Sequence, residues 1–131
     1  MVFASEVCLS QCNEKSQLYN CMATLGDYTF ARSYVLNFNQ STTSETVSYI
    51  FSERTMYLLE ICEVPGSSAN FEVTIYDSEG NFVTTNYDKK KRKYYSDLGF
   101  YCQKTAVYYI LFKYDSIKDS QDCALVILMY K

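Results

Sequence analysis

The sequence predicts an all-β protein, an antiparallel β-sandwich of jelly-roll type with about eight strands and a short N-terminal helical segment packed on it. Three observations lead to this fold class. Polar and apolar residues alternate along several short runs after residue 27, and turn signals separate the runs at the spacing of sandwich proteins. The chain contains 14 Tyr and 8 Phe, which suit half-buried pleated surfaces. Because Trp is absent, the Cys…Trp…Cys pattern of immunoglobulin domains is excluded, and a jelly roll is favoured.

The length of 131 residues predicts a single domain, with a helical or loop segment at 1–26 and the sandwich at 27–131. In the first segment, apolar residues recur three or four positions apart, as on one face of a helix. Ser5 is a suitable N-cap and Gly26 a suitable stop. Two short helices, or a helix and a loop, remain alternatives.

The strands follow in order from residue 28. We expect them at residues 28–39, 46–52, 55–64, 71–76, 81–87, 94–102, 106–114 and 123–131. The clearest local signal is "FEVTIYDSEGNFV", in which Asp77–Gly80 forms a turn with Gly80 in the left-handed conformation, so a hairpin is expected. A tight turn at Glu53 and Arg54 is expected to join the strands at 46–52 and 55–64, and Pro65 is expected to end the second of them.

The last expected strand is apolar on both faces. One face carries Cys123, Leu125, Ile127 and Met129, and the other carries Ala124, Val126, Leu128 and Tyr130. A strand of this kind has to be covered on both sides. The N-terminal segment is the candidate for the second cover.

Six cysteines are many for an intracellular chain of this length, and they favour disulfides and an oxidising compartment. The pairing that we expect is Cys62–Cys102, Cys21–Cys123 and Cys8–Cys12. A zinc site using Cys8, Cys12 and Cys21 is the weaker alternative, because a fourth ligand and the usual C-x₂-C spacing are missing. We expect an exported protein whose signal peptide was removed, since none is visible in "MVFASEVC". The run "LSQC", which ends at Cys12, resembles a lipoprotein cleavage site and is the weaker alternative.

A basic run, Lys89, Lys90, Lys91, Arg92 and Lys93, precedes Tyr94 and Tyr95. The whole chain has 12 basic and 15 acidic residues, so the remainder has 7 against 15 and is strongly acidic. This distribution argues against a nucleic-acid partner, for which basic charge spreads over a face. The simplest interpretation is a hydrated loop between strands, whose charges discourage edge pairing. Contact with an anionic glycan or lipid headgroup is the alternative.

The absence of His excludes Ser-His-Asp and Cys-His catalysis and His-based metal centres. Glu60 and Glu63 lie on opposite faces of one expected strand, so they cannot form a carboxylate pair. Asp115, Asp119 and Asp122 are weak calcium candidates in one loop, without the spacing of an EF-hand. We therefore expect no catalytic residue, no cofactor and no metal.

The stretches "YIFSERTMYLLEIC", "FEVTIYDSEGNFV" and "FYCQKTAVYYILFKY" resemble pre-peptidase C-terminal domains, a group of secreted bacterial jelly-roll modules. They also resemble small exported bacterial β-sandwich proteins of unknown function. The resemblance covers about residues 46–131, and Ala106 stands where the pattern has Gly. It implies a non-catalytic accessory module, and no functional residue is carried over.

Together these features predict a disulfide-stabilised, exported module for binding or assembly, without catalysis. The expected partner is a protein or glycan in the periplasm or at the cell surface. No transmembrane segment is expected, because the longest apolar run, "CALVILMY", has the length of a strand. The alternatives are a calcium-dependent accessory domain and a small hydrolase that uses carboxylates.

Overall fold

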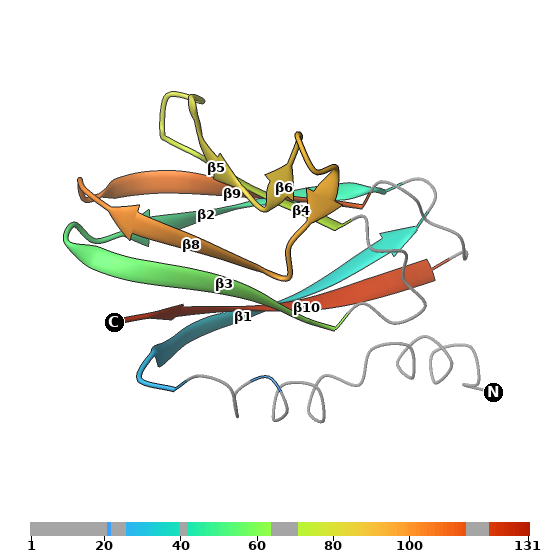
Figure 1. Cartoon of the computed structure of the whole chain (residues 1–131), viewed down its shortest axis with the longest axis horizontal. Helices are drawn as coiled ribbons and strands as arrows, with labels where there is room; N and C mark the ends of the chain where they lie inside the picture. The colour runs from blue at the N-terminus through green and yellow to red at the C-terminus, as the bar shows by residue number, and fades with distance from the viewer. Residues whose placement is uncertain (1–20, 22–25, 40–41, 64–70, 115–120) are drawn as a thin grey trace.

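The computed structural model describes residues 21, 26–39, 42–63, 71–114 and 121–131, without the side chains of residues 39, 63 and 121–123. Two four-stranded antiparallel sheets face each other within these residues (Figure 1). The predicted all-β sandwich is therefore confirmed. The expected helical segment at 1–26 lies outside the described residues except for Cys21 and Gly26, so it stays a prediction.

The strand order is that of a jelly roll. Sheet A consists, in spatial order, of β1 (Thr29–Asn39), β10 (Gln121–Tyr130), β3 (Thr55–Glu63) and β8 (Asp97–Cys102). Sheet B consists of β2 (Ser44–Phe51), β9 (Ala106–Tyr114), β4 (Phe71–Tyr76) and β5 (Phe82–Thr85). A separate two-stranded ribbon, β6 (Tyr87–Asp88) and β7 (Lys93–Tyr94), lies between β5 and β8 in the sequence. The first sandwich strand pairs with the last and the second with the second-last, as in two Greek keys.

The core between the sheets is rich in aromatic rings. Phe51 is fully buried at the end of β2, and four rings surround it at centroid distances of 4.5–5.4 Å, namely Tyr49, Tyr57, Phe100 and Tyr108. Most of these pairs are edge-to-face, the arrangement that aromatic quadrupoles favour. The high content of Tyr and Phe is thus explained in part by this core.

Strand β10 is buried on both faces, as predicted. Ala124, Val126 and Leu128 belong to the core between the sheets, whereas Ile127 and Met129 belong to a second cluster on the outer side of sheet A. Cys21 and Tyr28 pack in this second cluster. The part of the second cover that the structure describes therefore comes from the beginning of the chain.

Among the described residues, no helix has the length and apolar character needed to cross a membrane.

A bulge in β1 changes the expected distribution of its side chains. Phe30 is opposite Met129 and Arg32 is opposite Leu128, so Ala31 is an extra residue in the ladder. Because of this bulge, Phe30 packs in the outer cluster while Tyr34 points into the core between the sheets. Strict alternation along residues 28–39 would place Phe30 and Tyr34 on one face, and the bulge places them on opposite faces.

The cysteine pairing also differs from the expected one. Cys21 forms a disulfide with Cys62, with Cα atoms 5.4 Å apart, and Cys102 is a buried free thiol. The expected bonds Cys62–Cys102 and Cys21–Cys123 are therefore wrong. Cys102 is opposite Thr55, seven residues along β3 from Cys62, which is about 23 Å at ~3.3 Å per residue. The expected Cys8–Cys12 bond lies outside the described residues, as does the side chain of Cys123.

The disulfide is expected to stabilise the fold because it connects the beginning of the chain to β3 across 41 residues. Replacing Cys21 and Cys62 together with serine should lower the free energy of unfolding by about 2–4 kcal/mol. Urea denaturation followed by circular dichroism measures this loss. Mass spectrometry of a non-reduced digest tests the pairing itself, and a peptide that links Cys62 to Cys102 would contradict it.

Candidate functional site

The outer face of sheet B carries a group of apolar side chains, of which Tyr76 is half-buried and the others are exposed. We call this group the aromatic face: Ile50, Tyr76, Phe82, Val107 and Tyr109. The strand register aligns these residues in two rows. Ile50 is opposite Val107, while Tyr109, Tyr76 and Phe82 follow one another across β9, β4 and β5. The Tyr76 and Phe82 rings meet edge to face at a centroid distance of 6.4 Å.

Four of these side chains are exposed although strands β9 and β4 are well buried on the other side. Ile50 is 62% exposed and Phe82 61%, whereas their neighbours Phe51 and Ile75 are fully buried in the core. Four of the eight large exposed hydrophobic residues that the structure describes belong to this one face. Single exposed apolar residues are ordinary, but a contiguous group is typical of an interaction surface.

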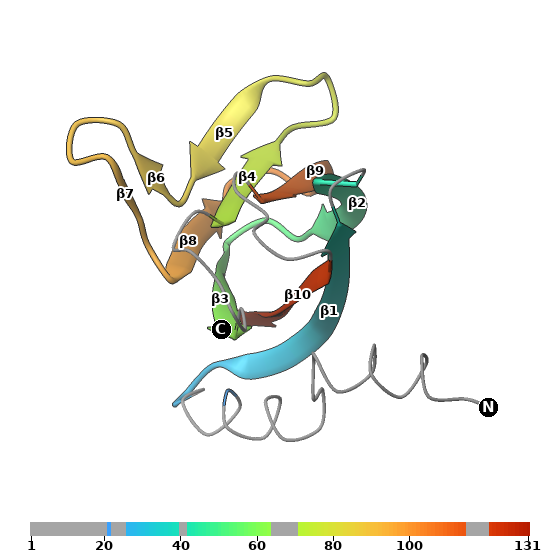
Figure 2. The same ribbon diagram turned by 90° about the vertical axis from the view of Figure 1, so that its right-hand side faces the viewer.

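The second feature is the basic ribbon, residues 87–95, which projects from the side of the sandwich beside β5 (Figure 2). Its two strands are joined by the ring contact of Tyr87 with Tyr94, at 4.5 Å between centroids. At its tip, one carboxylate oxygen of Asp88 accepts hydrogen bonds from the backbone N–H groups of Lys90 and Lys91, at 2.9 and 3.2 Å. All five residues of the predicted basic run are exposed; Lys89–Arg92 form the turn between β6 and β7, and Lys93 begins β7.

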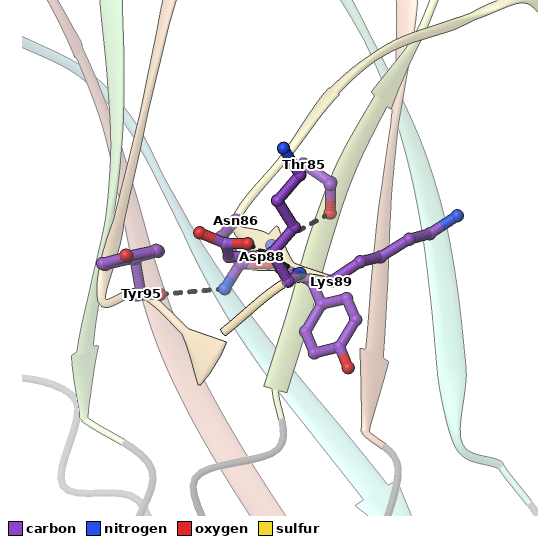
Figure 3. Close-up of a pocket in the computed structure, with 7 residues that line it drawn as sticks. Thr85, Asn86, Asp88, Lys89 and Tyr95 are labelled. Carbon is purple, nitrogen blue, oxygen red and sulfur yellow. Dashed lines mark hydrogen bonds between the residues drawn. The ribbon is translucent and has the colours of Figure 1, made fainter. Parts of the chain in front are cut away.

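Asn86 holds the base of the ribbon to sheet B, a role that the sequence did not indicate. Its side chain is 2% exposed and makes three hydrogen bonds. Its Oδ1 accepts from the N–H of Val73 at 2.7 Å, and its Nδ2 donates to the carbonyl oxygen of Phe71 at 2.9 Å. The Nδ2 also donates to the carbonyl oxygen of Tyr95 at 2.9 Å (Figure 3). The Asn86 side-chain amide therefore takes the place of backbone hydrogen bonds at the end of β5. In addition, the backbone N–H of Tyr95 donates to the backbone carbonyl of Asn86, which holds Tyr95 at the same place.

Two hollows connect the ribbon to the aromatic face. The first, of about 460 Å³, is lined by Thr85, Asn86, Tyr87, Asp88, Lys89, Lys90 and Tyr95 (Figure 3). The second, of about 280 Å³, is lined by Glu72, Thr74, Tyr76, Phe82, Thr85, Tyr87 and Lys89. Because Thr85, Tyr87 and Lys89 line both hollows, the ribbon and the aromatic face form one continuous surface.

A third hollow, of about 390 Å³, lies apart from this surface, with β5 residues on one wall and Phe100, Tyr101 and Tyr108 among its lining residues. Burial raises the pKa of the Tyr108 phenol, and its hydrogen-bond contact with the Cys102 thiol raises this pKa further. The Tyr108 hydroxyl donates to the carbonyl of Lys104 at 3.1 Å. The raised pKa keeps Tyr108 neutral, and the hydrogen bond to Lys104 engages its hydroxyl. Tyr108 therefore has a structural role.

The metal candidates cannot be placed fully. Asp115 and Asp119 lie outside the described residues, and for Asp122 only the backbone is described, opposite Phe38 in the ladder. Within the described part of the chain, no group of three or more His, Cys, Asp or Glu side chains is arranged to hold a metal ion. The calcium site and the cysteine zinc site therefore stay predictions.

Comparison with known proteins gives one informative likeness. No family model matches the chain, and no curated protein matches it. Among solved structures, the fold is similar to Aeromonas hydrophila PliG, a periplasmic lysozyme inhibitor of g-type lysozyme, with a TM-score of 0.54, 10% identity and coverage of 78% of this chain and 87% of that one. This likeness is one of fold. No family model supports the resemblance to pre-peptidase C-terminal domains.

Proposed function

We propose that this chain is an exported, non-catalytic binding module whose aromatic face contacts another protein. The observation that carries the proposal is the group of exposed apolar side chains on sheet B, with Ile50 and Phe82 each more than half exposed. Burying such side chains against a partner is favourable at about 25 cal/mol per Å² of apolar surface. Most other large apolar side chains that the structure describes are buried in two cores.

The composition of the surface supports a protein contact. Protein interfaces combine an aromatic or aliphatic centre with a polar rim, and Tyr and Phe are enriched at their centre. Here the rim is polar along β2, where Thr46 and Ser48 point outward, and basic where Lys89 borders the second hollow. The similar fold of PliG belongs to a protein that inhibits another protein, lysozyme, and is periplasmic. The Cys21–Cys62 disulfide is consistent with an exported protein.

Site-specific photocrosslinking in the cells that express the protein tests this proposal. A photoreactive phenylalanine analogue is placed at Phe82 or Ile50, and at Tyr101 as a control. Tyr101 is a matched position because it is an aromatic residue, 52% exposed, on β8 of the other sheet. We expect a discrete protein adduct from Phe82 and Ile50 and none from Tyr101. Equal labelling from all three positions, or none from the aromatic face, would contradict the proposal.

A further inference from the structure

We propose that the basic ribbon and the first hollow form a second binding site, for an acidic polysaccharide whose sugar rings carry carboxylate groups. This site adjoins the aromatic face, because Thr85, Tyr87 and Lys89 line both hollows, but its argument does not rest on the protein contact. The sugar chain would lie in the hollow lined by Tyr87 and Tyr95, with its carboxylates toward Lys89 and Lys90.

The basic run carries positive charge that no ion pair between described residues neutralises. The ion pairs between described residues are Arg54–Glu53 and Lys131–Asp27, and neither involves the ribbon. The acidic neighbour of the basic run, Asp88, uses a carboxylate oxygen to accept two backbone hydrogen bonds of the turn. Four cations on the exposed turn, and a fifth at the start of β7, are thus concentrated at one end of the ribbon in a chain that is otherwise strongly acidic. An anionic ligand is attracted to this turn and repelled by the rest of the surface.

The backbone that carries these charges is held in place. Asn86 and the Tyr87–Tyr94 ring contact fix the base of the ribbon, and Asp88 fixes the turn. A ligand that binds a preorganised loop loses less free energy to ordering than one that binds a flexible tail. The ribbon therefore differs from a disordered basic tail.

The shape and the lining of the first hollow suit a sugar chain. Its volume of about 460 Å³ is within the range of small-ligand sites, roughly 300–1,000 Å³. Tyr95 is 37% exposed, and the Lys93 ammonium lies 4.8 Å from the centre of its ring. A tyrosine ring offers an apolar face for the C–H side of a sugar and a hydroxyl for its polar edge.

The same observations disfavour other polyanions. A membrane anchor combines basic residues with apolar side chains that insert, and the turn from Lys89 to Arg92 has none. A nucleic acid covers a wide face, and outside the run the chain has 15 acidic against 7 basic residues. A single polysaccharide chain is narrow enough to contact the ribbon alone.

Binding of the full protein to polygalacturonate fragments, measured by isothermal titration calorimetry, tests the proposal. The matched probe is fully methyl-esterified polygalacturonate, which has the same backbone without the charges. We expect the esterified probe to bind at least about tenfold more weakly. The triple variant Lys89→Gln/Lys90→Gln/Lys91→Gln should also lose about tenfold or more in affinity. Tyr95→Ala should weaken binding about threefold or more, as expected for a lost ring contact.

The control variant is Lys104→Gln/Lys113→Gln/Lys131→Gln, which changes the net charge equally but lies outside the ribbon. It should retain affinity within about threefold. Equal losses in the two triple variants, or no binding of polygalacturonate by the unmodified protein, would overturn the proposal. Single-stranded DNA or vesicles containing phosphatidylglycerol that bind as tightly as polygalacturonate would overturn it in favour of a general polyanion site. Thermal melting verifies that each variant is folded.

Discussion

Replacement of Phe51 with alanine is expected to lower the free energy of unfolding by about 3–5 kcal/mol, the range for large aromatic residues in cores. The Phe51 ring is fully buried and has four aromatic neighbours from both sheets, at centroid distances between 4.5 and 5.4 Å. Its removal leaves a cavity that these rings can fill only by changing their own packing. Urea denaturation followed by circular dichroism measures the loss.

The matched control is Phe82→Ala, which removes the same side chain from the aromatic face. Because Phe82 is 61% exposed, we expect its loss to change the free energy of unfolding by less than about 1 kcal/mol. The pair thus separates a residue that stabilises the fold from one that is available for binding. A cost for Phe82→Ala that equals the cost for Phe51→Ala would mean that the aromatic face is part of a core, and the proposed protein contact would be lost.

Asn86→Ala is expected to cost about 3 kcal/mol or more, since each buried group left without a partner costs about 1–3 kcal/mol. The substitution leaves the N–H of Val73 and the carbonyl oxygens of Phe71 and Tyr95 without their side-chain partner. The loss should also loosen the ribbon, because Tyr95 is held at Asn86. Urea denaturation measures the stability, and hydrogen exchange at the Val73 amide reports the local opening.

Asn81→Ala is the control for this prediction. Asn81 is also an asparagine that contacts a turn, but it is exposed, and its side chain donates a hydrogen bond to Asp77 at 3.1 Å. Water can replace that bond, so its loss should cost less than about 1 kcal/mol. If Asn86→Ala costs no more than Asn81→Ala, the described hydrogen bonds of Asn86 are not the anchor of the ribbon.

The surface proposed for binding was only partly visible in the sequence. The basic run was recognised as a loop between strands because its charges stand together and β signals flank it. The aromatic face was harder to find, because "AVYYILFKY" in β9 is apolar at both odd and even positions. Alternation does not say which of two apolar faces is covered by another sheet. Asn86 gave no signal, since its partners on β4 are 13 and 15 residues away.

The sequence by itself determined much of the local structure: the eight sandwich strands, the turn of the β4–β5 hairpin that Gly80 ends, and the burial of β10 on both faces. The expected strands 81–87 and 94–102 were too long, because β5 ends at Thr85, β8 begins at Asp97 and the β6–β7 ribbon lies between them. These properties depend on the period of apolar residues and on turn chemistry, which act over a few residues. Only the tertiary structure decided the Cys21–Cys62 pairing, the bulge at Ala31 and the contacts of Asn86. Each of these depends on which strands become neighbours. The packing of the two sheets decides which strands become neighbours, and the residue pattern within a single strand does not predict it.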